Sequence, residues 1–225
     1  MKKPAADLCT FDSEAPCTQC PNHLQIFCKP DASKVIVSHL LESSFLVIAG
    51  FGLWMTGLML GSWLPVVIFA VFSALFFLVI QSRITCSHCP YYAEDRRFLH
   101  CTENHFTPKI WRYHPEPITR WEKAGTTIGF AALAAYPLLF EFYAIFQAVR
   151  LPLLTLAGLV GIFLATIFTL ALFYVTFFLL YCPHCVNFSC AFNKVPKQYV
   201  EEYLRRNPVI AEAWKTAGNS HERKH

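Results

Sequence analysis

Four long runs of almost uncharged residues constrain the fold of this chain more than any other feature. A helix needs about 20 apolar residues to cross the hydrocarbon core of a bilayer. With 55% hydrophobic residues and 21 Phe among 225 residues, the chain is also too apolar for an ordinary soluble domain. The sequence therefore predicts four transmembrane helices, over residues 44–60, 64–80, 126–140 (continuing to 149) and 151–181.

The four runs pair into two hairpins with short turns. Each turn contains a proline, Pro65 or Pro152, that favours a break between helices. We expect an all-α membrane protein in which cysteine-rich cytosolic segments alternate with the hairpins, and in which the last segment ends in a short helical tail. The expected segments are 1–32 (Cys-rich), 33–81 (hairpin 1), 82–124 (Cys-rich), 125–181 (hairpin 2) and 182–225 (Cys-rich with the tail).

Basic residues predict the orientation of these spans. Four Lys and Arg precede the first span, seven lie between the hairpins, seven follow the last span, and Arg150 alone lies in the second turn. By the positive-inside rule, the side with eighteen of the nineteen basic residues is cytoplasmic. We therefore expect an integral protein of the cell or cytoplasmic membrane with both termini in the cytoplasm. The net charge of +4 gives no indication of nucleic acid, so the lipid bilayer is the expected partner.

Three cysteine clusters lie outside the apolar runs, and each contains a C-x-x-C pair and a third cysteine. Two thiolates at that spacing lie within reach of one metal ion. A cytosolic location keeps thiols reduced, which disfavours disulfides. The clusters therefore predict metal ligation, with redox or nucleophilic thiol chemistry as the alternative. Their members are Cys17, Cys20 and Cys28; Cys86, Cys89 and Cys101; and Cys182, Cys185 and Cys190.

Zinc and iron–sulfur clusters are equally compatible with these ligands. The Cys-Pro pairs at Cys20 and Cys89 are similar to those of ferredoxin ligand runs, although the full ferredoxin spacing is absent. Zinc takes four Cys or His ligands. The further candidates are Cys9 or His23 for the first cluster, His88, His100 or His105 for the second, and His184 for the third. Cys9 is equally well explained as an inert buried thiol, and His88 and His184 as donors to backbone carbonyls.

The two halves of the chain resemble each other, which indicates an internal duplication. Each hairpin is followed by C-x-His-C, an aromatic residue, another cysteine and an asparagine, Asn104 or Asn193. The first helix of each hairpin also carries a pair of glycines four residues apart, which lets helix backbones approach closely in lipid. A pseudo-two-fold axis would then bring four thiols together in one site, Cys86, Cys89, Cys182 and Cys185, with Cys101 and Cys190 left for a second.

Few polar residues enter the predicted spans. No span contains a histidine, so we expect no transmembrane bis-His haem. Glu141 lies in the third span, where a carboxylate is costly and often functional. Its alternative role is structural, at the interface or paired with Arg150. Because no second acidic residue or ladder of metal ligands crosses the bilayer, a metal-translocating pore is poorly supported.

Short helices and caps are expected outside the apolar runs. Asp31 is a candidate helix start, and Thr119 with Glu122 fits a capping box before the third span. Near the C-terminus we expect one short helix, and then a second that begins at Asn207 and stops at Gly218.

Three functions follow from these features. In the first, iron–sulfur or zinc sites at the membrane surface belong to a larger complex with partner membrane or redox subunits, and iron–sulfur centres would pass electrons to a quinone or a partner. In the second, zinc holds short cytosolic segments together in a membrane scaffold. In the third, the thiols act as a redox sensor or a cysteine-based enzyme. Whether the chain is an enzyme stays open.

Overall fold

The computed structural model describes residues 8–11, 15, 17–149 and 151–222. Helices make up its regular structure, and no strand occurs in these residues beyond an isolated bridge between Phe98 and Pro108. The long helices are α1 (Ala32–Leu60), α2 (Leu64–Leu75), α4 (Arg120–Ala148) and α5 (Leu153–Thr176). Four helical stretches are long and apolar enough to cross a membrane, Ala32–Leu60, Leu64–His88, Arg120–Ala148 and Leu153–Tyr181, as expected for an integral membrane protein.

The ends of the long helices follow from local chemistry. The carboxylate of Asp31 accepts hydrogen bonds from the backbone N–H groups of Ser33 and Lys34 at the start of α1. Thr119 and Glu122 form the expected capping box at the start of α4. At the other end of α1, Gly61 has a φ of 63°, a left-handed conformation that costs glycine little and turns the chain into α2. The first span is longer than the apolar run indicated, because helix α1 begins twelve residues before it, at Ala32.

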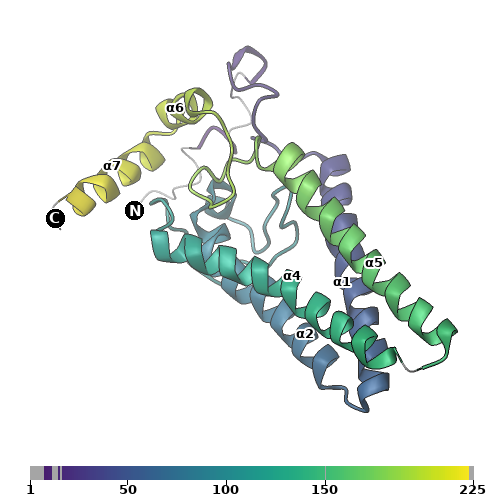
Figure 1. The fold of residues 1–225 in the computed structure, drawn as a ribbon. Coiled ribbons are helices and arrows are strands. Elements are labelled where there is room, and N and C mark those ends of the chain that lie inside the picture. Colours follow the sequence, from purple (N-terminus) through teal and green to yellow (C-terminus); the bar gives the residue numbers. More distant parts are fainter. Residues whose placement is uncertain (1–7, 12–14, 16, 150, 223–225) are drawn as a thin grey trace.

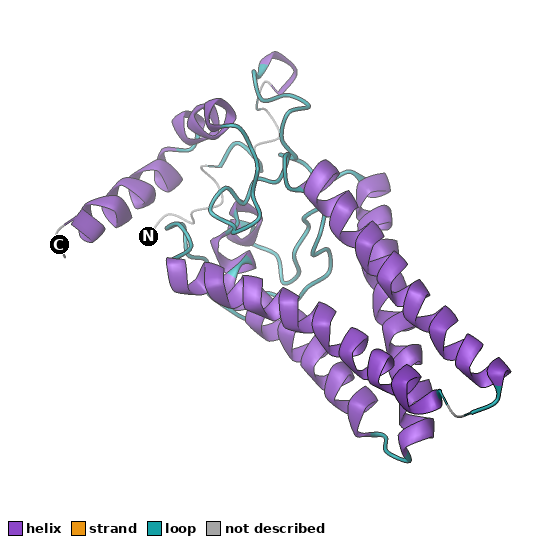
Figure 2. Ribbon diagram, viewed as in Figure 1, coloured by secondary structure: helices purple, strands orange, loops and turns teal. Residues whose placement is uncertain are grey.

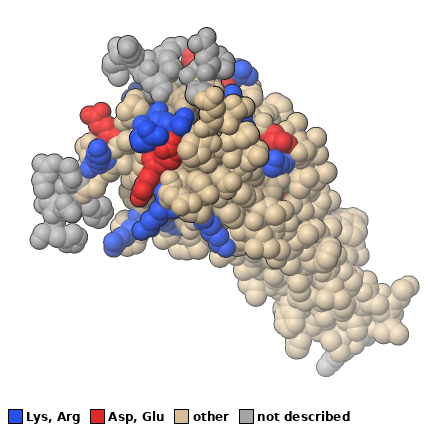
Figure 3. Space-filling view, turned by 90° about the horizontal axis from the view of Figure 1, so that it is seen from above, with Lys and Arg blue, Asp and Glu red and all other residues tan. Residues whose placement is uncertain are grey.

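The four long helices form one bundle that is open at one end. Figure 1 shows α2 beside α4 and α1 beside α5, with the two pairs close together near the hairpin turns and farther apart at the opposite end. The segments between and after the hairpins lie beyond that open end, the first mostly as loops and the second as loops followed by two helices (Figure 2). In Figure 3, the Lys, Arg, Asp and Glu side chains visible on this face gather at the same end. This separation of charge from apolar surface suits a protein embedded in a bilayer.

In both hairpins, the second helix ends in a π-helical segment. These segments are η3 (Phe76–Gln81), which follows α2, and η6 (Phe177–Tyr181), which follows α5. After η3 the chain continues as α3 (Ser82–Ile84), then the 3-10 turns η4 (Cys86–His88) and η5 (Pro90–Ala93). A π-segment widens the helix by one residue per turn and is often found at functional sites. The segment η6 ends immediately before the third cysteine cluster, and α3 separates η3 from the second.

Two apolar cores hold the molecule together. Within the bundle, Phe45, Leu53, Phe69, Phe76 and Leu133 are buried against one another. Above it, the cysteine-rich segments and the tail share a second core that includes Leu8, Tyr91, Leu99, Val186 and Tyr203. The cysteine-rich segments are therefore packed structures with a core of their own.

The helical tail closes the second core. It consists of α6 (Lys197–Arg206) and α7 (Pro208–Glu222), with Asn207 between them as predicted. Tyr203 of α6 is 1% exposed, and its hydroxyl pairs with that of Thr10 at 2.7 Å. The expected stop at Gly218 is wrong, because α7 continues to Glu222. A single glycine costs a helix only about 1 kcal/mol, which the surrounding turns offset.

Candidate metal centre: ten cysteines around two cavities

The second and third cysteine clusters line one cavity at the open end of the bundle. Its six cysteines come from both sides of hairpin 2, and the cavity has a volume of about 120 Å³. The members are Cys86, Cys89, Cys101, Cys182, Cys185 and Cys190, and we call this space the six-cysteine cavity. The lining includes Cys86, Cys89, Cys182 and Cys185, which the pseudo-two-fold axis grouped in one site, and also Cys101 and Cys190, which the sequence analysis left for a second site.

Aromatic side chains from both hairpins line the same cavity. Phe77 and Gln81 come from η3, and Phe177 and Phe178 come from η6, so both π-segments contribute to the wall. Further aromatic residues of the lining are Phe27, Tyr91, Phe130, Phe173, Tyr174 and Phe192. The cavity is therefore largely apolar around its thiols, with the membrane-spanning helices forming part of its wall.

Backbone and asparagine hydrogen bonds position these cysteines. The Cys89 N–H donates to the carbonyl of Cys86 at 2.9 Å, which closes the 3-10 turn η4. The Cys182 N–H donates to Phe177 at 2.8 Å, so η6 sets the start of the third cluster. Asn193 donates to the Cys185 carbonyl at 2.7 Å, and the Asn104 N–H donates to the Cys101 sulfur at 3.1 Å. An N–H group that faces sulfur stabilises a thiolate more than a neutral thiol.

Burial keeps these thiols in their neutral form in the metal-free chain. Desolvation raises the pKa of Cys101 and of Cys182 to about 12 and the pKa of Cys89 and Cys185 well above the ordinary value of 9.0. A nucleophilic or redox-sensing cysteine instead has a lowered pKa in an electropositive, partly exposed site. The environment of the six-cysteine cavity is therefore a poor one for thiolate nucleophiles.

Two carboxyl groups that the sequence did not single out also line this cavity. Glu42 comes from α1, and Glu103 comes from the segment after Cys101. Burial, together with the nearby Glu42, raises the pKa of Glu103 to about 7. Glu42 lies inside a helix and Glu103 in an irregular loop, so no local spacing connects them, and only the tertiary fold brings both to the cavity.

The first cluster and Cys9 line a second, larger cavity of about 670 Å³. Its thiols are those of Cys9, Cys17, Cys20 and Cys28, and we call this space the four-cysteine cavity. Burial, together with the nearby thiol groups of Cys9, Cys17 and Cys20, raises the pKa of Cys28 to about 12. These four cysteines therefore lie near one another and apart from the other six.

The histidines divide differently from the sequence prediction. His23 and His184 line the four-cysteine cavity, although His184 follows Cys182 in the third cluster. His88 lines neither cavity: its Nδ1 is 2.7 Å from the carbonyl oxygen of Glu116, and its Nε2 is 3.6 Å from Glu122 Oε1. His100 and His105 contact each other edge to face outside the lining. This placement does not support His88, His100 or His105 as direct ligands of a metal in the six-cysteine cavity.

The cysteines surround each cavity without converging on a point. Among the described residues, no three His, Cys, Asp or Glu side chains are placed to hold a single metal ion. All ten cysteines are free thiols. The predicted metal sites therefore stay predictions, and what the structure adds is the division of their ligands between two cavities.

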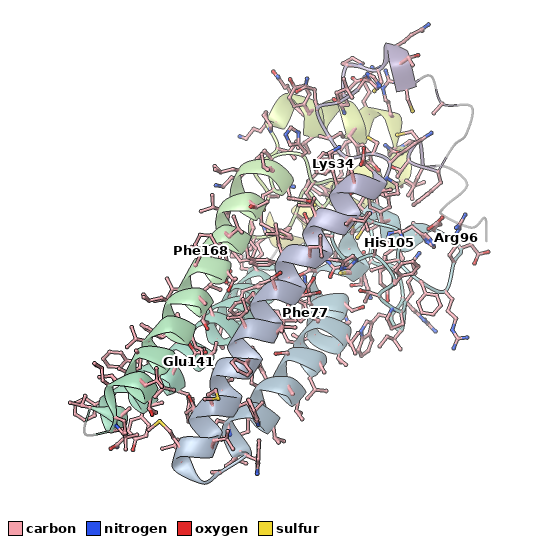
Figure 4. The ribbon with its side chains drawn as sticks, turned by 90° about the vertical axis from the view of Figure 1, so that its right-hand side faces the viewer. Lys34, Phe77, Arg96, His105, Glu141 and Phe168 are labelled. Atoms are coloured by element: carbon pink, nitrogen blue, oxygen red, sulfur yellow. The ribbon has the colours of Figure 1, made fainter. Side chains whose placement is uncertain are left out.

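Glu141 lies within the bundle towards the hairpin turns, away from Lys34 and His105 (Figure 4). The residue is 3% exposed, and its carboxyl accepts a hydrogen bond from the Thr166 hydroxyl at 3.0 Å. A Cβ on Gly52 would collide with the same carboxyl, so the missing side chain of this glycine makes room for it. The side chain thus points into the bundle and not to the interface, and the expected partner Arg150 lies outside the described residues.

No family model, no curated protein and no solved structure matches this chain.

Proposed function

We propose that this protein is an integral membrane iron–sulfur protein whose six-cysteine cavity holds a cluster at the cytoplasmic membrane surface. One observation carries the proposal. Six thiols from segments on both sides of hairpin 2 line one buried, aromatic cavity between the spans. Iron–sulfur clusters are bound by cysteine thiolates, and their potentials depend on burial and on hydrogen bonds to sulfur, such as that from Asn104 to Cys101.

The open arrangement of the thiols favours a polynuclear cluster over a single zinc ion. Zn–S bonds of about 2.3 Å place four tetrahedral sulfurs roughly 3.8 Å apart, around one point. In the described part of the chain the six thiols instead line the wall of one cavity, and no three His, Cys, Asp or Glu side chains form a group that could hold a metal ion. The sulfur ligands of an iron–sulfur cluster are farther apart, because iron and sulfide lie between them. Cysteines around a cavity fit that requirement better than they fit a single ion.

Pseudo-symmetry supports a shared site, and we propose that the two hairpins arose by duplication. In each half, a π-segment precedes C-x-His-C: η6 ends immediately before Cys182, and four residues, including the short helix α3, separate η3 from Cys86. In each half, the histidine Nδ1 lies 2.7 Å from a backbone carbonyl oxygen, Glu116 for His88 and Gln25 for His184. Equivalent ends of two hairpins would thus supply equivalent ligands to one cluster.

The cluster would serve electron transfer to a quinone or to a partner subunit. Basic residues gather at the end of the bundle that holds the cavity, and by the positive-inside rule we assign that end to the cytoplasm. The wall contributed by the spans would place a cluster next to the lipid-facing bundle, where a membrane-soluble carrier or a membrane subunit is accessible. A zinc-bound scaffold is the alternative, and metal content separates the two.

The test is anaerobic purification followed by iron, sulfide and zinc analysis and a visible spectrum. We expect iron and sulfide in similar amounts with thiolate-to-iron absorption, and a loss of both in Cys89→Ser. His105→Ala is the matched control, because His105 follows Cys101 in the chain but lines neither cavity, so this variant should keep all iron and sulfide. A colourless protein with bound zinc would support the scaffold, and metal-free protein with ten titratable thiols would contradict both functions.

A further inference from the structure

We propose that Cys9, Cys17, Cys20 and Cys28 hold a second iron–sulfur centre, separated from the six-cysteine cavity by the Phe27 side chain. These four thiols line a cavity of their own. Along the chain they follow the spacing C-x7-C-x2-C-x7-C, which places one further cysteine on each side of the central pair. The identification of the bound group as an iron–sulfur cluster rests on the proposed function. The existence of a second metal site with four thiolate ligands does not depend on that function.

Two hydrogen bonds with Asn207 fix the position of Cys9, whereas a surface thiol with no structural role would lack such contacts. The backbone N–H of Cys9 donates to Asn207 Oδ1 at 2.8 Å, and Asn207 Nδ2 donates to the Cys9 sulfur at 3.2 Å. Asn207 itself is completely buried at the junction of α6 and α7. A buried amide that holds both the backbone and the sulfur of one cysteine orients it as outer-shell partners orient metal ligands.

The charge around the four-cysteine cavity suits an anionic ligand set. Lys29, Lys34 and Arg206 line it, with Asp31 as the acidic residue of the lining. Asp31 is engaged by Lys34 at 3.3 Å and by the N-terminal N–H groups of α1. Four thiolates around a cluster carry net negative charge, which nearby cations stabilise. The lining therefore compensates the charge that ligation would create.

Phe27 forms a common wall between the two cavities. It belongs to the lining of both, and its backbone connects them. On one side, the Tyr91 hydroxyl donates to the Phe27 carbonyl at 2.9 Å. On the other, the Phe27 N–H donates to the backbone carbonyl of His184 at 2.7 Å, and the Phe27 and His184 rings stack with centroids 5.2 Å apart. Two centres that face one side chain would be close enough to interact magnetically when both are paramagnetic.

The cavity size and the spread of its donors favour a cluster here as well. The cavity of about 670 Å³ is larger than a single ion requires. Its four thiols lie together in the wall of this space. A cluster spans the space between such thiols, whereas a zinc ion would require the whole segment to contract around it.

The test compares single substitutions in the full-length protein, purified without oxygen in detergent. We expect Cys17→Ser and Cys20→Ser each to lose about half of the iron and sulfide, and Cys89→Ser to lose the other half. His23→Ala is the matched control, because His23 lines the same cavity but lies outside the four-thiolate set, and it should keep all iron. Electron paramagnetic resonance of the reduced protein should show coupled spins, and either kind of Cys→Ser variant should show a simpler, uncoupled signal.

Other outcomes contradict one proposal or the other. If Cys17→Ser and Cys20→Ser lose zinc while iron is unchanged, the second site is not an iron–sulfur centre, and the proposed function stands. If both keep all metal, the four-cysteine cavity is not a ligand site. If the wild-type protein lacks iron altogether, the proposed function fails. Zinc lost on substitution of Cys17 in that iron-free protein would still establish a four-thiolate site, with a different metal.

Discussion

Asn187 Nδ2 donates a hydrogen bond to the backbone carbonyl of Thr85, 2.8 Å away, and so joins the ends of the two hairpins next to Cys86. Both residues are buried, with Asn187 5% and Thr85 9% exposed. The hydroxyls of Thr85 and Thr126 pair in turn at 3.1 Å. The second and third cysteine clusters are thus connected by a direct polar contact as well as by their shared cavity.

Asn187→Ala should destabilise the protein by about 1–3 kcal/mol, because it leaves the buried Thr85 carbonyl without this donor. We also expect lower metal occupancy of the six-cysteine cavity, since the two hairpin ends are no longer held in register. Thermal unfolding in detergent and metal analysis measure the two effects. Glu201→Ala on the exposed face of α6 is the control, and equal behaviour of the two variants would contradict the prediction.

Gly52→Ala should disrupt the packing of α1 against α4 and α5. Its Cβ would meet the Glu141 carboxyl and the Ile162 side chain, and such overpacking costs about 1–3 kcal/mol. Gly50→Ala is the matched control in the same helix, because no heavy atom lies within 4 Å of a Cβ there. The melting temperature in detergent should fall for the first variant only, and a similar fall in both would show that the Glu141 contact is not the cause.

The two glycines of the G-x-x-x-G pair in α4 should differ in their tolerance of a side chain. A Cβ on Gly129 would strike the Phe76 ring, whereas a Cβ on Gly125 would meet only Ile84 Cδ1 at an ordinary 3.6 Å. Gly129→Ala is therefore expected to lower stability by about 1–3 kcal/mol, and Gly125→Ala to have little effect. Unfolding measured in parallel for both variants checks this, with an intolerant Gly125 as the contrary result.

Glu103→Gln should change the pH dependence of stability. Burial raises the pKa of Glu103 from 4.5 to about 7, so the folded state holds this proton more tightly than the unfolded state does. Its contribution to stability is full below pH 4.5 and is lost as the pH rises to about 7. Relative to the wild type, Glu103→Gln should therefore unfold at a higher temperature at pH 8 and at a similar temperature at pH 5. An equal difference at both pH values would exclude an ionising Glu103 as the cause.

Much of the architecture was predictable from local sequence. The four spans follow from apolar runs that only a bilayer accommodates, and their starts from the caps at Asp31 and Thr119. The local pattern did not predict the end of α7 correctly, because the helix continues past Gly218 to Glu222. The local pattern was also insufficient for Glu141, whose burial depends on Gly52 and Thr166 from two other helices.

The candidate sites were predictable only as separate clusters. Spacing along the chain grouped nine of the ten cysteines into three clusters, because C-x-x-C is a local pattern. This spacing placed His184 with Cys182 and Cys185. In the structure the His184 ring instead contacts Gln25 and Phe27, and the residue lines the four-cysteine cavity. No local pattern connects Cys9 with a partner, and its contact with Asn207 arises only because α6 and α7 pack against the N-terminal segment.

The sequence by itself determined that this chain has four apolar spans and that its cysteines lie outside the apolar runs, since hydropathy and spacing are properties of contiguous residues. Only the tertiary structure decided how those cysteines divide into six and four. That division depends on which segments the two hairpins bring together at the open end of the bundle, and on the placement of Phe27 between the cavities. Contacts between residues far apart in the chain have no signature in local spacing, and they create the two cavities.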